Sequence, residues 1–270
     1  MKIRRFIEGA TVPVAILIVW ELASRLGFFS PTILPPPSEV AVKWWSYLAP
    51  LTPYDPADGS YAKWLFSGEL IHDTYSSMYR VVVGFAIGAG LALPIGLLMG
   101  ANNKIHDLLN PLAQILRPIP PIAYIPLAIL WFGLGNPPSF FLIAIGAFFP
   151  VLMNTIAGVR QVDSIYLRAA ANLGANQWIL FSRVILPAST PFILAGMRIG
   201  IGTAFIVVIV SEMIAVNEGL GFRILEAREF MWSAKIIAGM ITIGLLGLAI
   251  DTAFSKLNNH LLRWHRGLES

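Results

Sequence analysis

The 270-residue sequence contains no cysteine and has few charged residues. The absence of cysteine excludes disulfides, thiolate metal ligands and thiol nucleophiles. Charged residues make up 13% of the chain, about half of the roughly 25% that is usual in soluble domains. Catalytic motifs are missing as well, because the sequence has no GxxxxGK[ST] loop for ATP phosphates, no HExxH and no GxSxG. These absences predict a non-catalytic chain with no metal site and no cofactor of its own.

What the sequence does have is long apolar blocks. Hydrophobic residues make up 56% of it, and the mean hydropathy is +0.71. A helix needs about 20 apolar residues to cross a bilayer, and blocks of about that length recur along the chain. We therefore predict an all-α polytopic membrane protein with about six spans, near residues 9–26, 78–99, 122–134, 139–159, 191–215 and 236–254.

The basic residues indicate the orientation of these spans. With the N-terminus inside, twelve of the 19 lysines and arginines fall on the inner side and seven on the outer side. Cytoplasmic loops carry such an excess, so both termini are predicted to be cytoplasmic. The net charge of +4 is explained in the same way, and no nucleic-acid partner is expected. The seven outer residues are Arg25, Lys43, Lys63, Arg80, Arg223, Arg228 and Lys235.

The predicted outer connections at 28–73 and 217–235 are long. In the first, prolines lead to Ser38, which we expect to cap a short helix. Residues 51–64 are typical of a turn-rich loop. In the second, glycines predict a turn before a short amphipathic helix.

Two acidic residues lie within predicted spans, Glu21 and Glu212. An ionisable group in a membrane is a functional candidate by default, but both lie near a predicted interface, where a hydrated structural role is about as plausible. Glu212 is better interpreted as the partner of a nearby arginine than as a contact for an anion. With the adjacent Ser211 it remains a substrate-path candidate. Arg198 fits an anchor at the inner membrane surface.

Prolines and glycines mark places where helices break or approach closely. Pro118 to Pro121 predict an interfacial elbow, and Pro126, which either begins a helix or bends one beside a path, is a further substrate-path candidate. The glycines predict tight helix packing within the subunit or, alternatively, the seam of a homodimer. They are Gly84, Gly88, Gly196, Gly200 and Gly202.

The segment "YLRAAANLGANQWILFSRVILP" is semi-polar although it lies between two apolar blocks. Asp163 or Ser164 is expected to cap a first helix, and Gly174 to end it in a left-handed conformation. Asn176 is expected to cap a second helix, which Pro187 would stop. The product is a helix–turn–helix projection on the cytoplasmic side, or alternatively an interfacial helix lying on the bilayer.

This segment resembles the EAA loop of binding-protein-dependent ABC importer permeases. The family pattern is Glu-Ala-Ala, three residues, Gly, nine residues, then Ile-x-Leu-Pro. The matching positions, with Val184 at the isoleucine and Arg168 in place of the glutamate, are Arg168, Ala169, Ala170, Gly174, Val184, Leu186 and Pro187. By this resemblance they form the loop that couples to an ATPase, although Arg168 departs from the pattern.

Other stretches resemble the nitrate/sulfonate/taurine/bicarbonate branch of that family, among them "LPPPSEV", "LRPIPPIAYIPLAILWFGLG" and "WHRG". The resemblance implies a type I importer fold in a bacterial inner membrane. It also implies a single permease domain over 1–270, with a first span and outer loop at 1–75, a core at 76–257 and a cytoplasmic tail at 258–270.

The resemblance further implies which partners the chain has. Two permease copies would pair, separate ATP-binding subunits would use ATP and Mg, and an external binding protein would deliver an anion. The motifs favour an alkanesulfonate or taurine, with nitrate or bicarbonate as the alternative. A non-transporting membrane scaffold or sensor is the alternative of a different class. An intramembrane enzyme is disfavoured because no embedded catalytic set is found.

Overall fold

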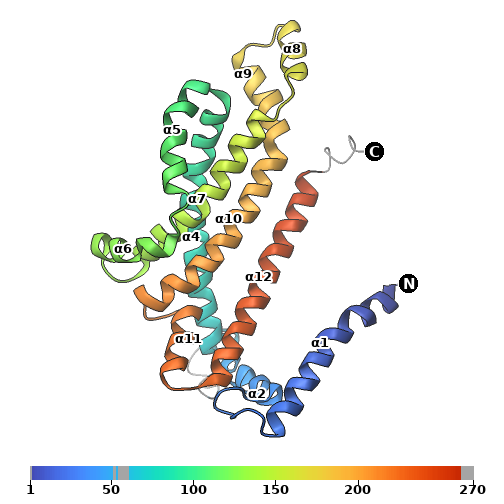
Figure 1. Cartoon of the computed structure of the whole chain (residues 1–270), viewed down its shortest axis with the longest axis vertical. Helices are drawn as coiled ribbons and strands as arrows, with labels where there is room; N and C mark the ends of the chain where they lie inside the picture. Colours follow the sequence, from blue (N-terminus) through green and yellow to red (C-terminus); the bar gives the residue numbers. More distant parts are fainter. Residues whose placement is uncertain (1, 51–52, 54–60, 263–270) are drawn as a thin grey trace. The chain divides into compact units, whose positions relative to one another are not determined.

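The computed structural model describes residues 2–50, 53 and 61–262, and gives no account of the side chains of residues 2–10, 62 and 63. Most of the predicted turn-rich loop at 51–64 and the end of the predicted tail, 263–270 with "WHRG", lie outside the described residues. Within them every regular element is a helix (Figure 1), which confirms the all-α prediction.

The helices follow one another closely along the chain. The short elements η2 and η3 are a 3₁₀ turn and a π turn. In order, the elements are α1 (Lys2–Arg25), α2 (Pro37–Leu48), α3 (Tyr61–Leu65), α4 (Glu69–Ala101), α5 (Asn103–Leu116), η2 (Pro121–Tyr124), α6 (Ile125–Phe132), α7 (Asn136–Arg160), α8 (Ser164–Asn172), α9 (Gln177–Leu180), η3 (Phe181–Ile185), α10 (Leu186–Ala215), α11 (Leu220–Glu229) and α12 (Ser233–Leu261).

Four helices among the described residues are long and apolar enough to cross a membrane. They are α4, α7, the continuous helix Gln177–Ala215 and α12. A fifth span results if α5 and the pair η2–α6, which are bent by 84° to each other, count as one broken span. The predicted span at 122–134 is therefore only a 3₁₀ turn and an eight-residue helix. The predicted first span lies within α1 and stays a prediction.

The bend between α5 and α6 has a cause in the sequence. Pro118, Pro120 and Pro121 follow the end of α5, and proline lacks the N–H that a continuing helix would need. The bend of the predicted elbow is therefore confirmed, and its location at the membrane interface stays a prediction. Pro126 is the second residue of α6 and exposed, a position where its missing N–H costs no hydrogen bond.

The chain divides into two compact units, each described here by itself. Unit 1 comprises Met1–Ser76 and Glu218–Leu245, and unit 2 comprises Ser77–Asn217 and Leu246–Ser270. In unit 2, α7 and α10 pack extensively against each other (Figure 1). A Cβ on Gly84 would lie 2.6 Å from the Ile143 side chain, and one on Gly196 would lie 2.6 Å from Asn154 Cβ. These glycines thus serve helix packing within the subunit, as predicted.

In unit 1 the start of α2 corrects one prediction. The N-cap residue is Pro36, with Pro37 as the first helical residue, and Ser38 is already inside the helix. The carboxylate of Glu21 on α1 takes over the capping role, because it accepts hydrogen bonds from Ser38 N (3.0 Å) and Ser38 Oγ (2.8 Å). A carboxylate at a helix N-terminus is favourable, so Glu21 has a structural role here.

Candidate functional site

The segment 163–187 contains two capped helices joined by a glycine turn. Asp163 Oδ1 accepts a hydrogen bond of 2.8 Å from Ile165 N, and Asn176 Oδ1 accepts one of 2.9 Å from Ile179 N. The first of the two predicted caps of α8 and the predicted cap of α9 are therefore confirmed. Between the helices Gly174 has a φ of +83°, the left-handed conformation that glycine adopts at little cost.

The predicted end of the second helix at Pro187 was wrong. The helix continues through α9, η3 and α10 as Gln177–Ala215. At η3 the backbone makes a π turn, in which Leu186 N donates to the carbonyl of Phe181, five residues back. The wider turn explains the continuation, because a proline in a regular helix collides with the carbonyl four residues back. Pro187 instead stands at the second position of α10.

Several large apolar side chains of the segment are exposed. Ile165, Tyr166, Leu173 and Trp178 are 60%, 63%, 89% and 72% exposed. Of the residues in the family pattern, Arg168, Ala169, Gly174 and Pro187 are exposed, whereas Ala170, Val184 and Leu186 are half-buried. The side chain of Arg168 makes no hydrogen bond or ion pair to any described residue. An exposed apolar patch of this kind is typical of a surface that binds another protein.

Glu212 lies in a buried polar cluster in unit 2. Arg80 Nη1 on α4 is 2.8 Å from Glu212 Oε1, and Ser77 Oγ donates to Glu212 Oε2 at 2.9 Å. Arg80 Nε donates to Asn136 Oδ1 at 2.7 Å. Both charged side chains are buried, so the prediction that Glu212 pairs with an arginine is confirmed. The neighbouring Ser211 is buried too and donates to a carbonyl of α10.

A groove runs along α10 in unit 2. It consists of two adjoining cavities of about 490 Å³ and 230 Å³ that share Pro121, Ile206 and Val207. The smaller one is lined by apolar residues and by Ser211. The larger one is lined by Arg117, Ile119, Pro121, Ile145, Gly146, Phe149, Pro150, Met153, Asn154, Ile199, Thr203, Ile206 and Val207. Of the three predicted path residues, Ser211 therefore lines the groove, and Pro126 and Glu212 do not.

Arg198 makes a second ion pair in unit 2. Its Nε and Nη2 atoms donate to the two carboxylate oxygens of Asp251 on α12, each at 2.7 Å. Both side chains are about half exposed. The fork of a guanidinium matches a carboxylate in this two-bond arrangement, so Arg198 is an interhelical tie as well as a basic residue.

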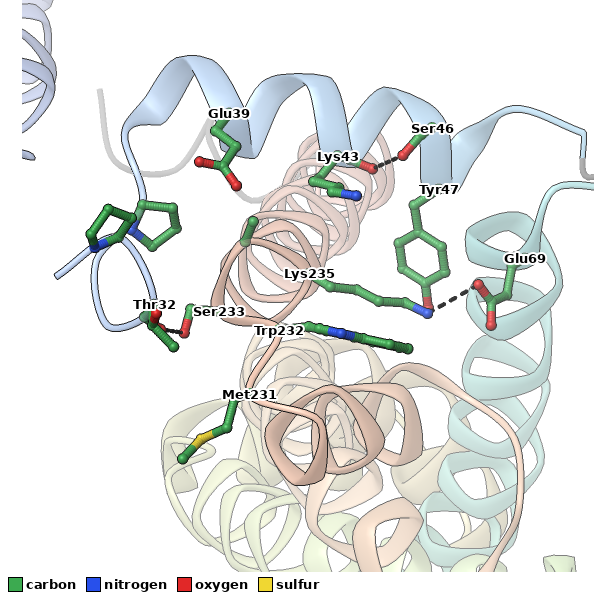
Figure 2. A pocket seen from close by; sticks show the side chains of 13 residues that line it. Thr32, Glu39, Lys43, Ser46, Tyr47, Glu69, Met231, Trp232, Ser233 and Lys235 are labelled. Atoms are coloured by element: carbon green, nitrogen blue, oxygen red, sulfur yellow. Dashed lines mark hydrogen bonds and ion pairs between the residues drawn. The ribbon is translucent and has the colours of Figure 1, made fainter. Parts of the chain in front are cut away.

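In unit 1, charged and aromatic side chains surround a separate cavity of about 490 Å³ (Figure 2). Lys235 Nζ lies 4.8 Å from the centroid of the Tyr47 ring, 5.5 Å from that of Trp232 and 3.1 Å from Glu69 Oε2. Met231, in the turn that carries Trp232, has a φ of +58°, which is uncommon for a residue with a side chain. The lysine is thus held by aromatic faces and a carboxylate together.

Behind this cavity a buried carboxylate joins three helices of unit 1. Asp73 accepts hydrogen bonds from Tyr47 Oη (2.7 Å), Gly219 N (3.0 Å) and Arg223 Nε (2.9 Å). Burial and then the charge of Asp73 raise the pKa of Tyr47, which keeps the phenol protonated. Burial alone would lower the pKa of Arg223, but Asp73 and other carboxylates outweigh it and raise that pKa. Tyr47 therefore stays a hydrogen-bond donor to Asp73, and Arg223 stays charged.

Sequence reasoning missed most of the groove and the unit 1 cluster. Arg117 was visible only as a basic residue before a proline-rich stretch, and Thr203 and Asn154 only as isolated polar residues in apolar blocks. Lys235 and Glu69 are 166 residues apart in the chain, so no local pattern joins them. Among the described residues no group of three or more histidines or acids is arranged to hold a metal ion.

Known proteins are similar to this chain over most of its length. The family model described as "Binding-protein-dependent transport system inner membrane component" matches residues 92–266. The aliphatic sulfonates transport permease SsuC of Bacillus subtilis is 35% identical over 98% of this chain and 90% of its own. The taurine transport permease TauC of Escherichia coli is 32% identical, over 93% and 86%. The bicarbonate transport permease CmpB of Synechococcus elongatus is 33% identical, over 97% and 93%.

Among solved structures, an inward-facing form of the MetNI methionine ABC transporter is similar in fold. The TM-score is 0.64 over 71% of this chain and 95% of that one, at 17% sequence identity. At such an identity the likeness extends to the fold alone. The helical arrangement is thus one that an ABC transporter permease adopts.

Proposed function

Because the chain belongs to the family of binding-protein-dependent transport system inner membrane components, we propose that it forms the membrane path for a small organic anion. As a member of that family it is a non-catalytic, multi-pass permease subunit of the inner membrane. Separate ATP-binding subunits, which hold ATP and Mg, supply the energy in this proposal, and an external binding protein delivers the anion. The observation that carries the coupling role is the exposed projection at 163–187, called the coupling segment below.

The coupling segment has the features of a docking element. Its slim alanine-rich helix α8 lets a partner approach closely, and exposed Leu173 and Trp178 offer the large apolar contacts that dominate protein interfaces. Arg168, without a partner among the described residues, is available for an acidic group on the ATPase. Movement of the ATPase would act directly on α10, because Gln177–Ala215 is one continuous helix.

The proposal extends to the assembly. Two copies of this chain pair in a type I importer arrangement, each a single permease domain with six spans and both termini in the cytoplasm. Four described helices of spanning length and one bent pair support such a fold. The inner excess of basic residues supports the orientation.

For the cargo we propose an alkanesulfonate or taurine. The names of SsuC and TauC, which align over nearly the whole chain, support a sulfonate. The alternative within the branch is bicarbonate or nitrate, and the similarity to CmpB supports bicarbonate. ATP hydrolysis by the assembled transporter, measured with each anion and the binding protein, distinguishes these cargoes. A non-transporting scaffold would take up none of them.

The first prediction concerns Gly174. Gly174→Trp forces a bulky residue into a left-handed conformation and places it on the docking surface, so co-purification of the ATPase and uptake should both be lost. Gly27→Trp is the matched control, since Gly27 has a φ of +78° and, like Gly174, nothing within 4 Å of its Cβ position. The control should keep ATPase binding. Normal uptake by Gly174→Trp would refute the docking role.

A further inference from the structure

The groove along α10 has one charged side chain among otherwise neutral walls. Of the described residues that line its two cavities, Arg117 alone carries a charge. Arg117 is exposed at the end of α5, and its side chain makes no ion pair or hydrogen bond to a described residue. The five N–H donors of its guanidinium are therefore available to a group that is not among the described residues.

The neutral polar groups of the wall are already used within the wall. Pro150 on α7 has no N–H, which frees the carbonyl of Gly146 four residues back. Thr203 Oγ1 on α10 donates to that carbonyl at 2.8 Å. Asn154 Nδ2 donates to the carbonyl of Pro150 at 2.8 Å. Irregular backbone within a membrane needs such partners, so these polar groups maintain the groove, while Arg117 has no comparable task.

The rest of the larger cavity is apolar. Its wall includes Phe149, Met153, Ile199 and Ile206, and its volume of about 490 Å³ falls in the usual range of small-molecule sites, roughly 300–1,000 Å³. A single cation beside an apolar wall is complementary to a molecule with one negative headgroup and a short alkyl chain. It offers no second charge to a zwitterion or a dianion.

We propose that the permease itself binds its cargo in this groove, with the acidic headgroup at Arg117 and the alkyl chain along Phe149, Met153 and Ile206. The proposal rests on the function proposed above and narrows it to monovalent alkyl anions, sulfonates first. Two of the three sulfonate oxygens can accept a pair of parallel hydrogen bonds from the planar guanidinium, as the oxygens of a carboxylate or a phosphate do. Arg117 would thus select the headgroup and the apolar wall the chain length.

The test uses the full chain with its ATPase in lipid nanodiscs, without the binding protein. Calorimetric titration with methane-, butane- and hexanesulfonate measures the affinity of the permease alone. Burial of each added methylene should tighten binding about two- to fourfold. Arg117→Gln should weaken all three sulfonates at least tenfold, and Arg117→Lys less, because lysine keeps the charge but not the fork.

Two further variants separate the roles of headgroup and chain. Arg160→Gln is the matched control, because Arg160 is an exposed arginine that does not line the groove, and its affinities should be unchanged. Ile206→Thr should reduce the gain per methylene and leave methanesulfonate binding alone. Gel filtration and thermal unfolding verify that each variant folds and assembles. If Arg117→Gln does not fold, the sulfonate affinities of Arg117→Lys and Ile206→Thr test the proposal instead.

The outcomes distinguish this inference from the function on which it rests. Equal sulfonate binding by Arg117→Gln and the wild type overturns the inference. So does a wild type that binds no sulfonate, for instance because a second copy of the chain covers the groove. If the complete transporter still takes up sulfonates, the proposed function survives either result. If the complete transporter takes up no sulfonate at all, the proposed function has failed on its own.

Discussion

At the scale of single residues, the buried pair Arg80–Glu212 shows how this chain tolerates charge inside a membrane protein. Both groups are removed from solvent, and further hydrogen bonds join Glu212 to Ser77 and Arg80 to Asn136. A buried ion pair adds little stability over a well-packed apolar pair, but removal of one partner is costly. The pair therefore ties α4 and α10 together, and Asn136 links it to α7.

This asymmetry gives a prediction at residue scale. Arg80→Leu deprives the buried carboxylate of Glu212 of its guanidinium and should destabilise the protein by about 3–5 kcal/mol. The double variant Arg80→Leu/Glu212→Leu should recover most of that loss. Unfolding of the purified chain in mixed micelles measures both. If the single variant proves as stable as the wild type, the pair does not hold the three helices together.

At the scale of elements, the coupling segment was largely predictable and its junction with α10 was not. Caps and a left-handed glycine act over three or four residues, so Asp163, Asn176 and Gly174 could be identified from local patterns. Pro187 follows an equally local rule, and that rule predicted a stop. It failed because one extra residue in the π turn moved the proline to a position where its missing N–H is harmless. Nothing in the spacing indicates that insertion.

The same limit applies to pairs that are distant in the sequence. An arginine partner for Glu212 was predicted because a carboxylate would repel an anion, but which arginine could not be predicted, since Arg80 lies 132 residues away. Ser38 looked like a cap by type and position, yet Glu21 on α1 performs that role. Hydropathy located the apolar parts of the long helices but not their ends, since α4 runs from Glu69 to Ala101 and the predicted span only from 78 to 99. Only the prolines indicated the 84° bend between α5 and η2–α6.

The π turn leads to a prediction at element scale. Pro187→Ala allows a regular α-helix to form across η3. The backbone would then lose the one-residue widening of the π turn, and Trp178 would rotate by about 100° relative to α10. We expect the variant to fold normally but to bind the ATPase less productively. Uptake per ATP hydrolysed should fall severalfold. Pro191→Ala, which alters a proline outside the π turn, should leave that ratio unchanged. The ratio is measured in proteoliposomes, and an unaltered ratio in Pro187→Ala would show that the π turn has no part in coupling.

At the scale of the whole molecule, the proposed function stands or falls with the orientation in the membrane. The coupling segment can meet an ATPase only if residues 163–187 are cytoplasmic, and an external binding protein can meet this chain only if the opposite connections face outward. Twelve basic residues fall on the predicted inner side and seven on the outer side. This excess favours the orientation, although each residue contributes little by itself.

The lack of cysteine makes that orientation directly measurable. Any single introduced cysteine is the only thiol in the chain, so labelling of whole cells with a membrane-impermeant maleimide reports its side. Thr32→Cys, at an exposed site before α2, should be labelled in intact cells, and Ser164→Cys, at the exposed start of α8, only after the membrane is permeabilised. Both positions are exposed in the isolated chain, so in cells that make this chain without its partners the bilayer alone limits access to the reagent. The reverse pattern would place the coupling segment outside the cell, where no ATP-hydrolysing partner could dock on it.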